Sequence, residues 1–426
     1  MKIIKNAQLV NNKRENIDIT PPRDQLMYKI LANVLELYGL ASMKLWNIPP
    51  YHVYLNKFYA INSLLIYTSP LCILSQLLYL YVHFNDMSFY TLGVMFSVLP
   101  IGITVLIKIA STRTNAYKKI MVNFMNKIHV HNQHLEEPDN EFIKSVVKQT
   151  ENFTHLATYF LAFCLLTDWT AWTAIPVIDY LKNKELIERK EKKLETCLYL
   201  YTPFDYSYDV GNWLIVHTFG SYLNFGGITI IIIFDTLCFI FVFNLVSHMK
   251  ILQHKMERIC KIDEMTNEDM RKKLIEIIEY HAQIINYFDD IQAAFGLNIT
   301  AVYAQNLFVD SLLLYQIMVG VNGEKTHVII FGLMFVAYMG GLTFMSFVLE
   351  EIRRQSETFS DLIYSLQWED MSKSNQTTVI MILAKMQPPL TFTGAGGLQT
   401  GVRPLVSIIK STFSYYVMLN NRTATR

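Results

Sequence analysis

Long stretches without charged residues constrain this chain of 426 residues more than any other feature. A helix that crosses the hydrocarbon core of a bilayer needs about 20 consecutive residues with few charges. Six such stretches occur, each with at most one charged residue: 58–82, 87–107, 152–178, 210–249, 291–323 and 326–349. One such run can arise in a soluble core, but six together indicate a membrane. The sequence therefore predicts an all-α integral membrane protein.

A seventh apolar segment, 386–419, is interrupted. It contains Arg403 and Lys410, and prolines and glycines crowd its first part at 388–397. Proline lacks a backbone donor and glycine adds conformational freedom, so a helix is expected to break there. We predict a short cytoplasmic helix before the break and a last span over about 401–420, which makes seven transmembrane helices.

The charges are balanced in number but not in position. Lys and Arg total 37 against 36 Asp and Glu, so no basic excess favours nucleic acid as a partner. Most Lys and Arg lie before the first span and after the second, fourth and sixth spans. Basic loops stay on the cytoplasmic side of a membrane. We therefore predict a cytoplasmic N-terminus and an extracellular C-terminus.

The segment after the fourth span is patterned like a helix rather than a connector. Thr266 and Asp269 resemble a helix-starting capping box. Apolar residues then recur at spacings of three and four over 274–295, up to the fifth span. A helix of some fifty residues would be about 75 Å long, far more than the membrane needs. Such extensions either pack together and hold subunits to one another, or fold back on their own chain.

No motif of an enzyme stands out. The sequence lacks a phosphate-binding loop, a His-Glu-x-x-His pair, a nucleophile elbow and a Cys-x-x-Cys pair. His217 and His281 have no neighbours at metal-binding spacing, so a structural role is favoured for each. We expect neither a cofactor nor a metal, and no enzymatic activity.

Three carboxylates fall inside predicted spans: Asp168, Asp235 and Asp310. Ionisable groups in a membrane are costly and often functional. They could relay protons in a transporter, or each could be satisfied by local hydrogen bonds. Aromatic residues are also dense near the outer ends of the spans, where they form either an interfacial belt or the wall of an apolar pocket.

The last third of the chain, about 276–420, resembles the insect odorant receptors. The resemblance rests on Ser356, Trp368, the run 384–393 around the paired prolines, and 413–419 with the sequence Phe-Ser-Tyr-Tyr-Val-Met-Leu. His281, followed by Phe288 and Phe295, also looks like the cytoplasmic helix of that family. The sequence around 394–398, Gly-Ala-Gly-Gly-Leu, is a looser match.

The resemblance implies an odorant-gated, non-selective cation channel of four subunits, held together mainly by cytoplasmic helices. The last helix would line a central pore. This chain would be the ligand-tuning subunit, assembled with a shared co-receptor as a heterotetramer in the plasma membrane of olfactory sensory neurons. Its implied partners are a small volatile odorant, the co-receptor and membrane lipid, with no nucleic acid.

The resemblance to the odorant receptor family also implies roles for individual residues of this sequence. The implied odorant pocket lies in the outer halves of the second, third, fourth and sixth spans, with Tyr90, Trp169 and His217 as polar handles. Its residues are Tyr90, Val94, Phe163, Leu166, Trp169, Val216, His217, Phe331, Met334 and Phe335. Met418 corresponds to the hydrophobic gate of the pore, and Ser411, Ser414 and Asn421 fall near the same helix face.

These expectations divide the chain into six parts. They are a cytoplasmic N-terminal segment (1–56), helices one to four with the outer pocket (57–250), a cytoplasmic loop and helix extension (251–298), helices five and six (299–350), a cytoplasmic anchor segment with the first part of the broken helix (351–400), and the pore helix with a short external tail (401–426).

Two alternatives remain open. A seven-helix G-protein-coupled receptor would need the opposite orientation to the one that the basic loops indicate. A proton-coupled transporter would need Asp168, Asp235 and Asp310 to act together.

Overall fold

A computed structural model describes residues 20–48, 55–133, 139–261, 265–321 and 325–424. These residues are almost entirely helical; their β-structure is one isolated bridge between Thr393 and Gln399. The α-helices are α2 (Leu26–Leu37), α3 (Leu55–His83), α4 (Phe89–Ser111), α5 (Asn115–Asn123), α6 (Asp139–Lys182), α7 (Lys184–Glu188), α8 (Val210–Cys260), α9 (Asn267–Val321), α10 (Lys325–Tyr364), α11 (Lys373–Met386) and α12 (Val402–Ala424). Short 3-10 or π turns occupy Pro22–Asp24, Met43–Leu45, Phe84–Asp86, Phe124–Ile128, Val130–Asn132, Trp368–Asp370 and Ala395–Gly397.

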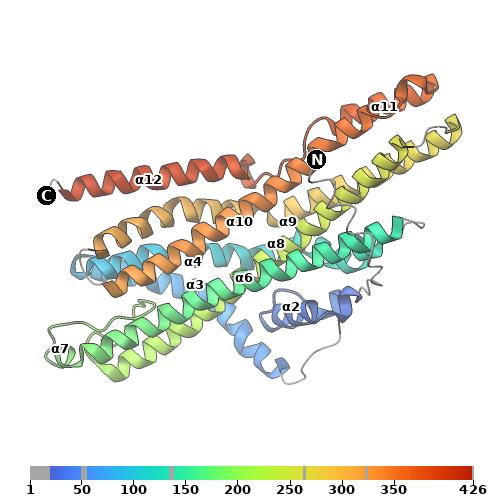
Figure 1. Cartoon of the computed structure of the whole chain (residues 1–426). Helices are drawn as coiled ribbons and strands as arrows, with labels where there is room; N and C mark the ends of the chain where they lie inside the picture. Colours follow the sequence, from blue (N-terminus) through green and yellow to red (C-terminus); the bar gives the residue numbers. More distant parts are fainter. Residues whose placement is uncertain (1–19, 49–54, 134–138, 262–264, 322–324, 425–426) are drawn as a thin grey trace, which may run out of the picture.

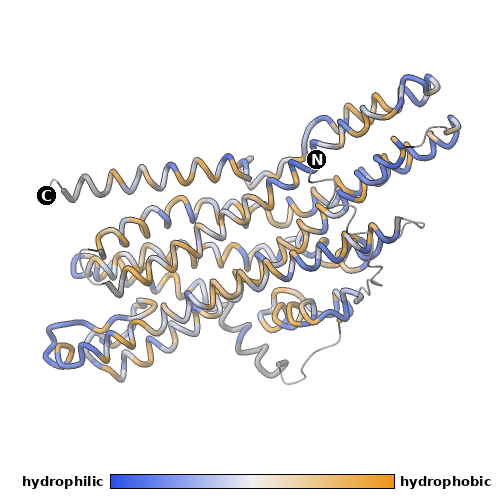
Figure 2. The backbone as a smooth tube through the Cα atoms, in the orientation of Figure 1, coloured by the Kyte–Doolittle hydropathy of each residue, from blue (hydrophilic) through white to orange (hydrophobic). Residues whose placement is uncertain are grey.

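The long helices lie roughly side by side in an elongated bundle (Figure 1). The loop with α7 and the end of α12 lie at one end of the bundle, and α11 and the junction of α8 with α9 lie at the other. Figure 2 shows hydrophilic residues gathered at both ends and hydrophobic ones between them.

Each of the seven predicted segments contains a long α-helix in its described part, and several helices are longer than predicted. Four helical stretches in the described part are long and apolar enough to cross a membrane: α4, Asn140–Lys182 of α6, α8 and Val328–Tyr364 of α10. The count of seven spans and the orientation stay predictions. The predicted break in the last segment is confirmed, because α11 ends at Met386 and α12 begins at Val402.

The predicted extension of the fifth span is confirmed. α9 runs without interruption for 55 residues, and α8 for 51. The start of α9 is a side-chain cap: the backbone N–H of Asp269 donates to the Thr266 hydroxyl (3.2 Å), which donates to the Asp269 carboxylate (2.7 Å). The cap satisfies a backbone donor that the first turn of a helix leaves free.

The extensions of α8, α9 and α10 pack on one another within a single chain. Leu274, Ile277, Ile284 and Ile291 on α9 are all buried. They belong to the largest core cluster, which includes most of α8 beyond Phe234. Burial of these side chains against neighbouring helices stabilises the extensions by the hydrophobic effect. The predicted packing of the extensions on one another is therefore present within one chain, and a further role in holding subunits together stays a prediction.

A turn between α5 and α6 ties α2 to this core. The Tyr28 hydroxyl lies 3.0 Å from His129 Nε2. The backbone N–H of Val130 donates to Asn244 Oδ1 at 3.0 Å, and His248 Nε2 donates to the carbonyl of Ile128 at 2.6 Å. Burial, with repulsion from His131 and His248, lowers the pKa of His129 to about 3.

We expect this turn to make the chain sensitive to acid. In the unfolded chain His129 gains a proton near its ordinary pKa of 6.5, whereas in the folded chain it stays neutral down to about pH 3. The free energy of unfolding should therefore be highest above pH 7 and fall by up to about 1.4 kcal/mol per pH unit below 6.5. Denaturation of the detergent-solubilised protein between about pH 8 and 5 measures the slope. H129Q should reduce it, and the control H83Q on α3 should not; equal slopes in all three proteins would contradict the assignment.

Candidate functional site

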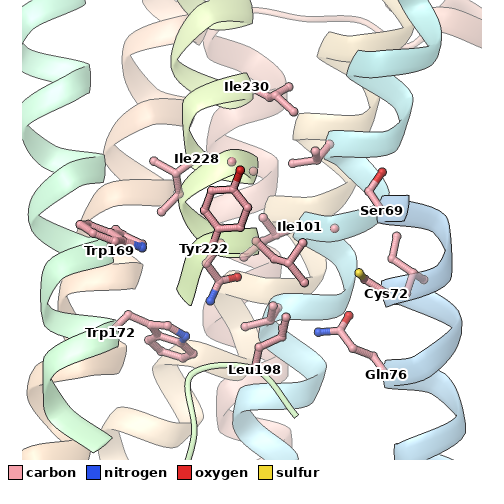
Figure 3. A pocket seen from close by; sticks show the side chains of 18 of the residues that line it. Ser69, Cys72, Gln76, Ile101, Trp169, Trp172, Leu198, Tyr222, Ile228 and Ile230 are labelled. Carbon is pink, nitrogen blue, oxygen red and sulfur yellow. The ribbon is translucent and has the colours of Figure 1, made fainter. Parts of the chain in front are cut away.

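An apolar cavity of about 130 Å³ lies between α3, α4, α6, α8 and α10. Figure 3 shows Trp169 and Trp172 reaching it from α6, and Cys72 and Gln76 from α3. The remaining wall is mostly aliphatic, from α4, α8 and the segment before α8. It includes Val98, Ile101, Val105, Leu198, Ile228 and Ile230. A cavity of this composition suits a small apolar molecule. We call it the outer cavity.

The polar atoms of three aromatic residues in its wall, Trp169, Trp172 and Tyr222, already have partners. The Trp169 indole N–H donates to the carbonyl of Ser221 (3.1 Å), and that of Trp172 to the carbonyl of Cys197 (2.8 Å). The Tyr222 hydroxyl donates to Asn62 Oδ1 at 2.8 Å. These bonds hold the rings in place and leave their apolar faces for a ligand. Recognition in this cavity therefore depends mainly on shape and dispersion contacts.

Four other polar side chains line the outer cavity: Ser69, Gln76, Asp168 and Asn224. Gln76 and Asp168 are 4% and 6% exposed. The Asn224 amide makes a long contact of 3.5 Å with the carbonyl of Cys197. Gln76 and Asn224 were not singled out from the sequence. The available signal was a stripe on α3, in which Ser69, Cys72 and Gln76 recur at helical spacing within an otherwise apolar span.

The ten residues predicted for the odorant pocket have different positions in the structure. Trp169 and Met334 line the outer cavity. Tyr90, Val94 and Phe331 are buried in the core cluster beside the cavity, to which Met334 also belongs, and Phe335 packs against that cluster. Phe163 and Leu166 point outward from α6, at 69% and 39% exposure. Val216 and His217 are buried at the start of α8 and do not line the cavity.

His217 occupies a structural position. Its ring stacks on Trp213, with centroids 5.1 Å apart. Nε2 lies 3.1 Å from the carbonyl of Thr173, and Nδ1 lies 3.4 Å from both the Cys197 N–H and the Thr196 hydroxyl. The ring therefore joins α6, α8 and the loop between them, which agrees with the structural role favoured from the sequence.

Two side chains hold the entry to α12. The backbone N–H of Gly401 donates to the Tyr303 hydroxyl of α9 (3.1 Å), and that of Val402 donates to the Glu350 carboxylate of α10 (3.2 Å). Tyr303 also bonds Ser346 of α10 at 2.7 Å. Gly401 has φ +106°, and a Cβ there would lie 2.5 Å from a Glu350 oxygen, so glycine is required. The start of α12 is thereby linked to both α9 and α10.

The connector before α12 is anchored to the same two helices. The backbone N–H of Leu390 donates to the Ser356 hydroxyl of α10 at 2.9 Å, and that of Thr393 donates to Gln292 Oε1 of α9 at 3.1 Å. Ser356 is one of the residues that carried the family resemblance. Its role here is to satisfy the backbone where the helix is broken.

α12 contacts the rest of the chain along a narrow stripe. Leu405, Ile408 and Thr412 are buried, whereas the larger apolar side chains on its other faces are exposed: Val406, Ile409, Phe413 and Met418. The predicted pore residues Ser414 and Met418 are exposed and Ser411 is half-buried. Asn421 belongs to α12, but its side chain lies outside the described residues.

The three intramembrane carboxylates do not form one site. Asp168 lines the outer cavity, and Asp235 is paired with Lys108 of α4 at 2.6 Å. Asp310 is fully buried, with no hydrogen-bond partner for either oxygen among the described residues. The described part also contains no group of three or more His, Cys, Asp or Glu side chains that could hold a metal ion. The geometry does not favour the transporter alternative.

Fold and cavity together are those of a multi-pass helical membrane protein with an apolar pocket among its helices. The family model described as 7tm odorant receptor matches residues 88–413. The chain belongs to this odorant receptor family. It is 22% identical to odorant receptor 30a of Drosophila melanogaster over 67% of this chain and 72% of that one, and 21% identical to odorant receptor 43b of the same species over 70% and 72%.

Solved structures show the same fold. The olfactory receptor OR5 of Machilis hrabei superposes with a TM-score of 0.72 at 16% identity, over 92% of this chain and 96% of that one. The same receptor in complex with eugenol superposes with a TM-score of 0.73 at 15% identity, over 93% and 97%.

We expect Y303F to weaken the entry to α12. The change leaves the buried Gly401 N–H without its acceptor, which costs about 1–3 kcal/mol. Thermal unfolding of the solubilised receptor should show a lower midpoint for Y303F. The control is Y364F, which removes a hydroxyl from an exposed tyrosine of α10. Equal midpoints for the two variants would show that the Tyr303 bond does not hold α12.

Proposed function

We propose that this chain is the ligand-tuning subunit of an odorant-gated, non-selective cation channel. It works with a co-receptor in a heterotetramer, in the plasma membrane of olfactory sensory neurons. The ligand is a small volatile apolar molecule. The pore is lined by α12, and membrane lipid surrounds the outer helices.

One observation carries the channel part of this proposal: α12 buries one stripe and leaves polar side chains, among them Ser407, Lys410 and Ser414, exposed beside apolar ones within one chain. A helix with exposed apolar and polar faces is stable in a membrane when other subunits or a water-filled pore meet those faces. Four such helices around an axis would satisfy this need. The placement of Met418, exposed near the end of the described helix, supports its role as a gate.

The outer cavity supports the ligand part. Its apolar walls match an apolar odorant, and the similar Machilis hrabei receptor has been solved in complex with eugenol. One of the two helices that hold the α12 entry, α10, also lines the outer cavity through Met334 and Tyr338. A shift of α10 on ligand binding would therefore reach Glu350 and the start of α12.

Odorant currents test the ligand site. I101F fills the outer cavity from α4, and I103F adds the same ring at an exposed position two residues on. Cells expressing the chain with an odorant receptor co-receptor should show a response to an odorant panel. I101F should raise the half-maximal concentration about tenfold or more, equivalent to about 1.4 kcal/mol, and I103F should leave it unchanged. Equal responses of the two variants would place the ligand elsewhere.

Basal current tests the gate. M418A shortens the side chain of the proposed hydrophobic constriction, so the pore should wet more easily and the current without odorant should rise. M381A on α11 is the matched control, because Met381 is also an exposed methionine. Currents that require a G protein would contradict the channel proposal and favour the G-protein-coupled alternative. Currents that do not depend on co-expression with the co-receptor would contradict the heterotetramer.

A further inference from the structure

A second cavity lies on the other side of Tyr338. It has a volume of about 160 Å³ and is lined by residues of α4, α6, α8, α9 and α10. Tyr338 borders both this cavity and the outer cavity. We call it the inner cavity. None of the residues predicted for the odorant pocket or the pore lines it.

The inner cavity opens toward lipid between α6 and α10. Phe160 of α6 and Val336 of α10 line it and are 63% and 68% exposed. Both belong to helices that are long and apolar enough to cross the membrane, so their exposed faces meet hydrocarbon. Gly340 and Gly341 widen the same wall, because a Cβ at either position would meet no atom within 4 Å. A molecule dissolved in the bilayer can therefore enter sideways.

The end of the inner cavity away from Phe160 and Val336 is polar but has no net charge. Lys108 and Asp235 line it as an ion pair 2.6 Å apart, with side-chain exposures of 2% and 18%. Each charge already has its partner, so an ionised ligand would arrive without a counter-charge and bear the full cost of burial. A neutral ligand is favoured.

One residue that lines the inner cavity has an amide oxygen without a hydrogen-bond partner among the described residues. Asn306 is 2% exposed and lines the cavity. Its Nδ2 donates to the carbonyl of Val302 at 2.7 Å, while its Oδ1 has no partner among the described residues. A buried acceptor without a donor is costly, so the site lacks one O–H or N–H group.

A small space of about 10 Å³ adjoins the ion pair and is lined by Asn298. Asn298 is 2% exposed, and neither of its amide atoms has a hydrogen-bond partner among the described residues. This volume is about that of one water-sized probe. Asn298 can therefore be satisfied by a water molecule, whereas Asn306 lines the larger, lipid-facing cavity.

We propose that the inner cavity binds a neutral, hydroxyl-bearing amphiphile taken from the bilayer. Its apolar chain would lie between Phe160 and Val336, beside the glycine pair, and its hydroxyl would donate to Asn306 Oδ1. Because Tyr338 also borders the outer cavity, a bound amphiphile would support the wall of the odorant pocket from behind. This binding does not depend on the proposed channel function.

Photolabelling of the full chain tests the site. The receptor is reconstituted in phosphatidylcholine nanodiscs and exposed to a long-chain primary alcohol that carries a diazirine in the middle of its alkyl chain. The matched alkane and the matched fatty acid, with the diazirine at the same position, serve as comparison probes. Peptide mass spectrometry should find the alcohol on the peptides of α6 and α10 that contain Phe160 and Gly341, with much weaker labelling by the other two probes.

Variants separate a site from general contact with lipid. G341F fills the cavity and should abolish this labelling, whereas G332F, at another open glycine of α10 that does not line the cavity, should keep it. N306L should lower labelling by the alcohol about tenfold and leave the alkane unchanged. A folding defect in G341F would also abolish labelling. N306L and the smaller change G340A distinguish this cause from loss of the site, and every variant is measured in protein that elutes as a single folded species.

Three results would overturn the proposal. One is equal labelling by the alcohol, the alkane and the acid. Another is labelling that G341F and N306L do not change. The third is labelling concentrated on peptides of the outer cavity, such as that with Cys72, which would place the alcohol in the odorant pocket instead.

Discussion

Backbone groups inside a membrane must find their hydrogen bonds within the protein, and the rest of this structure depends on that requirement. It explains why the described chain is almost entirely helical and why its polar loops gather at the two ends of the bundle (Figure 2). It also explains the side chains around the break before α12. Where the helix stops, Ser356, Gln292, Tyr303 and Glu350 bond backbone N–H groups that the missing helix would have satisfied. The break thus becomes a defined joint between α12 and two neighbouring helices.

Buried polar side chains also need hydrogen-bond partners, and the two cavities differ in how far that need is met. Around the outer cavity, indole N–H groups and the Tyr222 hydroxyl are engaged elsewhere, so mostly apolar surface remains. Around the inner cavity, an ion pair is satisfied but the Asn306 oxygen has no partner among the described residues. A ligand in the first is held by shape, and one in the second also by a hydrogen bond. Tyr338 separates the two.

Similarity to OR5 of Machilis hrabei at 15–16% identity shows that few particular residues are needed for this fold. Helix length, apolar patterning and a small number of polar contacts suffice.

The sequence by itself determined the helical segments, the long continuous α9 with its Thr266 cap, and the break before α12. These follow from local rules: apolar length, capping chemistry, and the lack of a donor in proline. It could not determine which residues face a cavity. Tyr90, Val94 and Phe331 pack into the core beside the outer cavity, and α3 supplies Gln76 and Cys72 instead. Nor did it reveal that Lys108 neutralises Asp235, 127 positions away. Only the tertiary structure decided these points, because the rotation of each helix about its axis, and therefore its neighbours, depends on packing against all the others.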